Sequence, residues 1–122
     1  MCRMFSQLSA ESYAYQTRSV RLGGHATSIR LEASFWSILE EIAAAQSVSL
    51  GRFLTKLHDE VLAFRGEPHN FTSLLRCACL TYVAEVRGRD DAVATMEREA
   101  QADFAHATRA PIGGALVASA TR

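Results

Sequence analysis

The sequence has no run of about 18 consecutive apolar residues, which is roughly the minimum that a transmembrane helix needs. The first residues also lack the apolar segment of a signal peptide. We therefore expect a cytoplasmic protein with no membrane partner. Thiols stay reduced in that compartment, so we expect no disulfide among the three cysteines.

Signals for metal or cofactor binding are scarce as well. No Cys-x-x-Cys pair occurs, and Cys77 and Cys79 would lie about 200° apart around a helix, too far apart to share a metal ion. We expect both to be small buried apolar residues. Gly23-Gly24 is not followed by the helix of a phosphate-binding loop. The sequence therefore predicts no metal and no cofactor.

The sequence also lacks the residue pattern of an enzyme active site. The histidines show no ligand spacing and stand at His25, His58, His69 and His106. His58 precedes Asp59 and Glu60, but adjacent residues of a helix point in different directions. A solvated helix face is therefore the simpler interpretation of this cluster. We find no nucleophile with a neighbouring base and orienting group, and we expect no enzyme.

Net charge is zero at pH 7, but it is unevenly distributed. The net charge of residues 1–30 is +3, because they hold four arginines and one acidic residue, Glu11. The net charge of residues 31–122 is −3, from nine basic and twelve acidic side chains. The arginines are Arg3, Arg18, Arg21 and Arg30. A basic N-terminal region on an acidic chain suits a nucleic-acid partner. Chance scatter of a few charges explains it equally well.

The length fits one domain, and hydrophobic periodicity divides the chain. Residues 9–15 can form two helical turns, and residues 27–32 alternate as a strand does. Two amphipathic helices follow, for which Ser34 and Ser49 are the expected N-caps, and Gly66 ends the second. We divide the chain into a lead-in over 1–26 with a candidate extra strand over 18–22, a core over 27–64, additional helices over 70–108 and a tail over 109–122.

The third helix, from residue 70 or 72 to about 86, is apolar almost all the way around. Such a helix must be buried on more than one side, and a subunit interface provides the second side. The single strand 27–31 also needs a partner, because one strand has two unpaired edges. Pairing it antiparallel with a second copy across a two-fold axis satisfies both. The expected dimer seam and core are Thr27, Ile29, Leu31, Phe35, Leu39, Ile42, Leu54 and Leu57.

These segments carry a family resemblance. The strand Thr27–Leu31, the helix from Phe35 to Ala43, the Ser49 cap and the helix from Leu50 resemble the ribbon-helix-helix DNA-binding family. The opening Met-Cys-Arg-x-Phe, the Arg-Ser-x-Arg-Leu segment before the strand and the Cys-rich helix resemble a longer bacterial branch of it. The likeness covers about residues 1–86. It implies a mainly α-helical fold with a short β-ribbon, forming an intertwined homodimer with additional helices.

The resemblance also implies a function. In this family the paired ribbon enters the major groove of double-stranded DNA, and the outward strand residues touch base edges. Ser28 and Arg30 become candidates for base contacts. The N–H groups at Ser49 and Leu50 become candidates for phosphate contacts, and so do Arg18 and Arg21. The implied protein is a transcriptional regulator, or the DNA-binding half of an antitoxin-like pair, with tandem dimers on adjacent half-sites for tight binding.

One alternative follows from the lead-in. If residues 23–26 form a four-residue hairpin loop, Leu22 faces Thr27 and Val20 faces Ile29, and all four side chains lie on the buried side. The dimer then has a four-stranded sheet. Since the major groove admits a two-stranded ribbon, the flanking strand could block entry. The chain would then be a dimeric structural or protein-interaction module that does not bind DNA.

Overall fold

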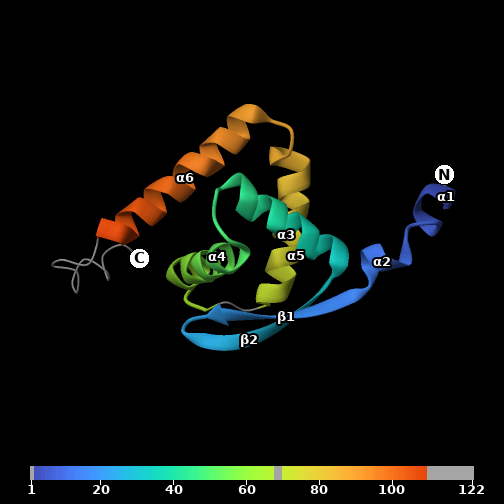
Figure 1. Ribbon diagram of the computed structural model, residues 1–122, viewed down its shortest axis with the longest axis horizontal. Coiled ribbons are helices and arrows are strands. Elements are labelled where there is room, and N and C mark those ends of the chain that lie inside the picture. The colour runs from blue at the N-terminus through green and yellow to red at the C-terminus, as the bar shows by residue number, and fades with distance from the viewer. Residues whose placement is uncertain (1, 68–69, 110–122) are drawn as a thin grey trace.

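One β-hairpin and the helices that pack on its inner face form the body of the molecule (Figure 1). This computed structural model describes residues 2–67 and 70–109, and only the backbone over residues 103–109. The strands are β1 (Tyr15–Leu22) and β2 (His25–Glu32), which pair antiparallel. The helices are α1 (Cys2–Ser6), α2 (Ala10–Tyr13), α3 (Ala33–Ala45), α4 (Leu50–Arg65), α5 (Phe71–Thr81), the π-helix η1 (Tyr82–Val86) and α6 (Asp90–Arg109).

This architecture confirms the expected fold class, which is mainly α-helical with a short β-ribbon and additional helices. The candidate strand 18–22 lies inside the longer β1. α5, η1 and α6 occupy the segment expected to hold additional helices, α6 runs on to Arg109, and the rest of the expected tail, residues 110–122, lies outside the described residues. None of the described helices is both long and apolar enough to cross a membrane.

The hairpin turn differs from the four-residue loop that the sequence predicts. Gly23 and Gly24 alone connect the strands, with φ angles of +59° and +83°. A two-residue turn of this kind needs positive φ at both central positions, which glycine adopts without steric cost. Leu22 therefore pairs with His25, and Val20 pairs with Thr27 rather than Ile29. The register moves by two residues, so the same side chains still face the helices.

A hydrophobic core fills the space between the hairpin and the helices. Trp36 and Leu39 on α3, Leu54 on α4 and Leu75 on α5 are all completely buried. The Trp36 indole Nε1 donates to the Gln16 carbonyl oxygen at 2.9 Å, which fixes α3 on β1. Most of the residues expected in the seam and core are buried, namely Ile29, Leu31, Leu39, Ile42 and Leu54. Phe35 and Leu57 are half-buried against this core, and Thr27 is half-buried on the same side of β2.

The caps of the helices agree with the sequence at both ends of α4 and disagree at the start of α3. The Ser49 side chain accepts from the Arg52 N–H at 3.2 Å and caps α4, and Gly66 ends this helix with φ +88°. The prediction that Ser34 caps the preceding helix is wrong. Because β2 runs on to Glu32, α3 begins at once with Ala33, and the Ser34 hydroxyl donates to the Ser12 carbonyl oxygen at 2.6 Å.

Two expectations about burial are also wrong. His58 is 8% exposed rather than solvated, because α4 turns it under the hairpin and edge-on to the Phe71 ring, with centroids 5.3 Å apart. Cys79 is buried as expected, but Cys77 is exposed. Leu80 and Val83 on the same helical segment are also exposed, at 63% and 41%. Within one chain, α5 and η1 therefore keep an uncovered apolar side.

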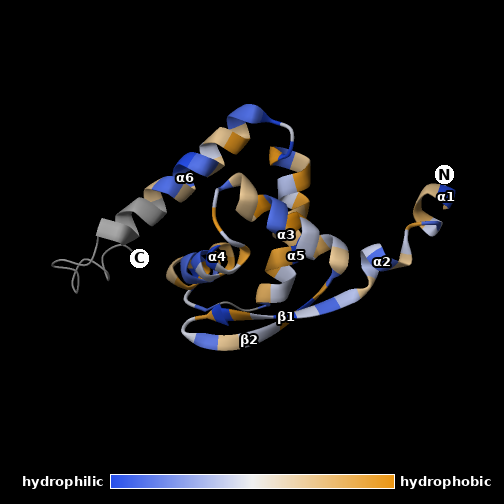
Figure 2. Ribbon diagram, viewed as in Figure 1, coloured by the Kyte–Doolittle hydropathy of each residue, from blue (hydrophilic) through white to orange (hydrophobic). Residues whose placement is uncertain are grey.

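Hydrogen bonds and ion pairs join α5, η1 and the following Arg87 to the end of β2 and to α3. Glu41 on α3 accepts from the Tyr82 hydroxyl at 2.7 Å and from two nitrogens of Arg87 at 2.8 and 2.9 Å. Arg76 on α5 binds the Glu32 carboxylate at 3.0 Å. Beyond η1, the chain turns and α6 runs back down the side of the molecule (Figure 1), with hydrophilic and apolar residues mixed along its described part (Figure 2).

Candidate nucleic-acid interface

The outward face of the hairpin is made of alternate residues from both strands. On β1 these are Tyr15, Thr17, Ser19 and Arg21, and on β2 they are Ala26, Ser28 and Arg30, all of them exposed. The face therefore holds hydroxyls, arginines and one aromatic ring. The only acidic residue of the hairpin is Glu32 at its end, and its carboxylate is bound to Arg76. The face is positively charged and rich in hydrogen-bond donors, which suits an anionic polymer.

Arg30 is exposed in the middle of this face. Its Cζ atom lies 4.1 Å from the centroid of the Tyr15 ring, so the flat side of the guanidinium stacks on the aromatic ring. Among the side chains of residues 2–67 and 70–102, no hydrogen bond or ion pair engages Arg30. Its five N–H donors are accordingly available at the edge of the group.

Arg18 lies on the opposite, inner side of the same hairpin. It donates to the Glu40 carboxylate at 2.7 Å and to the Gln16 side chain at 3.3 Å, and its Cζ lies 4.8 Å from the Trp36 ring centroid. Both the edges and the face of this guanidinium are therefore occupied. A phosphate contact by Arg18 would require it to leave Glu40.

Thr55, in the second turn of α4, lies at the outer edge of β1. The Thr55 hydroxyl donates to the Arg21 carbonyl oxygen at 2.6 Å. Since a helix rises about 1.5 Å per residue, Leu50 lies roughly 7.5 Å along α4 from this contact. Ser49 spends its side chain on the Arg52 N–H, and the first-turn N–H groups include that of Gly51, where a side chain would meet open space.

The two outer edges of the hairpin differ. Thr55 already binds the outer edge of β1. The Ala33 N–H donates to the Ala14 carbonyl oxygen at 2.8 Å, which sets the phase of the ladder and turns the backbone groups of Ser28 and Arg30 away from β1. In the described part of the chain, no strand pairs with this edge of β2.

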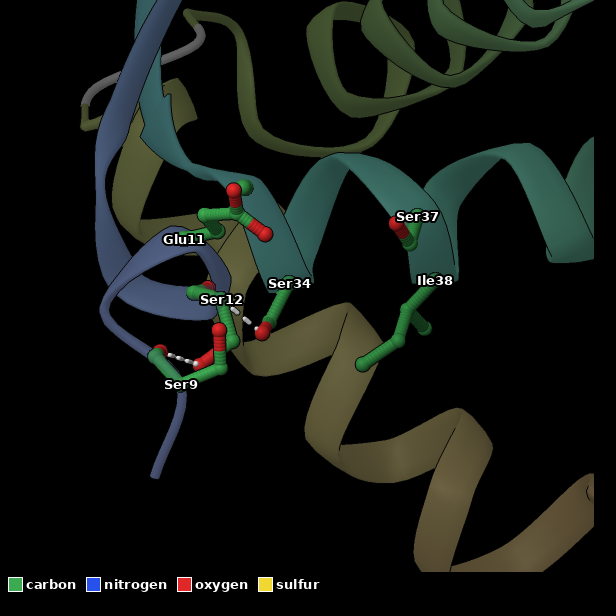
Figure 3. A pocket seen from close by; sticks show the side chains of 7 residues that line it. Ser9, Glu11, Ser12, Ser34, Ser37 and Ile38 are labelled. Atoms are coloured by element: carbon green, nitrogen blue, oxygen red, sulfur yellow. Dashed lines mark hydrogen bonds between the residues drawn. The ribbon is translucent and has the colours of Figure 1, made fainter. Parts of the chain in front are cut away.

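A shallow hollow opens between α2 and the start of α3 (Figure 3). It is lined by Ser9, Glu11, Ser12, Ala33, Ser34, Ser37 and Ile38. The Ser12 hydroxyl donates to the Ser9 carbonyl oxygen at 2.7 Å, and the Ser34 hydroxyl donates to the Ser12 carbonyl oxygen at 2.6 Å. These hydroxyls hold α2 on α3, and the hollow is a junction between the two elements.

The sequence-based expectations placed Ser28 and Arg30 on one outward face. The structure brings Arg21 onto this face as well, and turns Arg18, the other arginine expected to contact phosphate, toward Glu40 on the inner side. The expectations missed Tyr15, which we expected in a helical turn and which instead opens β1. The signal was available: residues 15–22 alternate, and a two-residue Gly-Gly turn places Tyr15 opposite Glu32.

Comparisons with known proteins agree with this geometry. A model of the ribbon-helix-helix domain matches residues 15–83. Among solved structures, an uncharacterized protein from Bordetella pertussis Tohama I is 48% identical, with a TM-score of 0.68 over 69% of this chain and 67% of that one. No curated protein matches the chain.

Proposed function

Because the chain belongs to the ribbon-helix-helix family, whose members are generally DNA-binding transcription regulators, we propose that it is a homodimeric, sequence-specific DNA-binding protein. The observation that carries the proposal is the outward face of the hairpin, which presents Arg21, Ser28 and Arg30 and no unpaired carboxylate. The proposal extends to regulation of transcription in the cytoplasm of a bacterium and, by resemblance of the lead-in and α5, to the longer branch of the family.

The dimer seam in this proposal is the outer edge of β2. The backbone groups of Ser28 and Arg30 point toward that edge, whereas Thr55 binds the outer edge of β1. Antiparallel pairing of two β2 strands therefore satisfies the open ladder and gives a sheet in the order β1-β2-β2-β1. The exposed apolar side of α5 and η1 adds a surface that a second copy can cover. The units 27–64 and 70–108 serve, in this view, as the family core and its helical extension.

The width of this sheet sets how it meets DNA. Four strands span about 14 Å between the outer strand axes, because neighbours lie about 4.8 Å apart. The major groove is about 12 Å wide. The two central β2 strands therefore face base edges, and the β1 strands lie over the phosphate backbones. This assigns Ser28 and Arg30 to bases, and Arg21 with the Ser49–Leu50 segment to phosphates. Arg18 supports the hairpin from within through Glu40.

A second candidate is a dimeric structural or protein-interaction module. It is favoured by β1, which flanks the central pair along its whole length and keeps a flat sheet from entering the groove as deeply as a free ribbon. Under this alternative the β2 seam and the core are unchanged, and the outward arginines remain solvated.

Selection from random duplex DNA, followed by a salt series on the enriched duplex, separates the two candidates. A sequence-specific DNA-binding protein should enrich a short palindrome. Its association constant should fall steeply with salt, by about one power of the salt concentration for each phosphate contact. Light scattering on the same sample should give the mass of a dimer. If the purified dimer enriches no motif and does not retard DNA at low salt, the DNA-binding proposal fails and the structural module remains.

A further inference from the structure

Tyr15 makes a direct contact with Arg30, the arginine that the proposed function assigns to a base. The two residues lie on the same outward face, with Arg30 Cζ 4.1 Å from the ring centroid. Tyr15 pairs with Glu32 and Thr17 pairs with Arg30, so the contact runs diagonally between the strands. Long side chains reach such diagonal neighbours. We propose that Tyr15 is a positioning residue that holds Arg30 in the orientation needed to contact a base; this inference rests on the proposed DNA-binding function.

The chemistry of the contact supports this role. A guanidinium binds the two acceptors of guanine through its N–H edge, in the plane of the group. Stacking on Tyr15 occupies the face and leaves that edge open. It also restricts a long side chain before binding, which reduces the conformational entropy lost when the base is contacted.

Arg18 provides an internal comparison. It also stacks on an aromatic ring, that of Trp36 at 4.8 Å, but its edge is bound to Glu40 at 2.7 Å. An arginine that serves only to hold the fold therefore has its donors satisfied within the chain. Arg30 has the stacking partner and, across the described residues, no carboxylate. This combination is the one expected of an arginine held ready for an external acceptor.

The inference gives β1 a use beyond flanking the seam. The extra strand places an aromatic ring next to each central β2 strand, on the face that would meet DNA. Because Tyr15 is 55% exposed, the contact contributes little to the core, and its removal should leave the fold intact.

The test measures binding of the full chain to the enriched duplex and to a scrambled duplex at one salt concentration. Tyr15→Leu should weaken binding to the enriched duplex about two- to fivefold, which is the range of an exposed cation–π contact, and should leave binding to the scrambled duplex unchanged. Tyr15→Phe keeps the ring and should restore most of the affinity. Tyr13→Leu is the matched control, because Tyr13 is 59% exposed but lies on α2, outside the hairpin.

A double-mutant cycle decides whether Tyr15 acts through Arg30. In an Arg30→Ala background, Tyr15→Leu should have no further effect on affinity. An equal loss in both backgrounds, or a failure of Tyr15→Phe to restore binding, would overturn the positioning role while leaving the DNA-binding proposal in place. If the wild-type chain enriches no motif at all, the proposed function fails and this role fails with it.

Discussion

The two faces of the hairpin use the same residue type for opposite purposes. On the inner face, Arg18 is enclosed by Trp36 and Glu40 and ties the hairpin to α3. On the outer face, Arg30 stacks on Tyr15 and keeps its hydrogen-bond donors open. Strand alternation alone separates them, since the side chains of β1 and β2 point alternately to the helices and to solvent. Stability should therefore depend on the inner face and DNA recognition on the outer one.

The largest effect should come from removing the ring beneath the inner face. Trp36→Ala deletes a completely buried side chain and its hydrogen bond to the Gln16 carbonyl oxygen. We expect a loss of about 3–5 kcal/mol in the free energy of unfolding, the usual range for a buried large aromatic residue. Urea denaturation followed by circular dichroism measures it. A loss under about 1 kcal/mol would show that α3 is not anchored on β1 through this residue.

The next largest effect should be on DNA recognition, with the stability of the fold unchanged. Arg30→Ala should abolish the preference for the enriched duplex, with a loss of roughly 1–3 kcal/mol of discrimination for each base contact. The urea midpoint and the dimer mass should not change, because Arg30 makes no hydrogen bond or ion pair in the described chain and its contact Tyr15 is 55% exposed. Competition titrations against scrambled DNA test the first expectation. Sequence preference that survives the substitution would move the base contacts elsewhere.

Arg18 and Arg21 form a matched pair with smaller expected effects. Arg18→Ala breaks a partly exposed ion pair with Glu40 and should lower stability by up to about 1 kcal/mol, with no change in the salt dependence of DNA binding. Arg21→Ala should leave stability unchanged and reduce the salt slope by about one for each chain. The reverse assignment of these effects would mean that Arg18 leaves Glu40 to bind phosphate.

The smallest effect is a pH dependence from the contacts between α3 and η1. Hydrogen bonds from Arg87 and then from the Tyr82 hydroxyl hold the pKa of Glu41 below its usual value of 4.5. A carboxyl with a lowered folded-state pKa stabilises the protein above its unfolded pKa, and this stabilisation is lost as the pH falls through the folded value. Stability should therefore fall below about pH 4.5. Glu41→Gln should flatten that slope slightly, and an unchanged slope would assign it to other carboxyls.

Much of this architecture could be predicted from local signals. The alternation over residues 27–32 indicated which side chains of β2 face the core, and the Ser49 cap and Gly66 marked the ends of α4. The positions of Ser28 and Arg30 on one outward face follow from the same period of two. These features depend on near neighbours in the sequence, where turn and capping preferences are strong.

Other features depend on distant parts of the chain and escaped prediction. His58 looked solvated beside Asp59 and Glu60, yet the hairpin turn and Phe71 bury it. Tyr15 looked helical, because it ends a segment that can form helical turns, and its strand partner Glu32 is 17 positions away. Ser34 looked like an N-cap, but β2 continues up to Glu32 and α3 begins at Ala33. The Ser34 hydroxyl instead donates to the Ser12 carbonyl oxygen.

By itself, the sequence determined the strand alternation and the helices, because each is set by the steric and hydrogen-bonding preferences of nearby residues. Only the tertiary structure decided that Arg18 is satisfied by Glu40 and Arg30 is not, and that Thr55 covers one edge of the hairpin while the other edge stays open. The reason is that these contacts join residues 22 to 34 positions apart, whose distance depends on how the helices pack over the sheet.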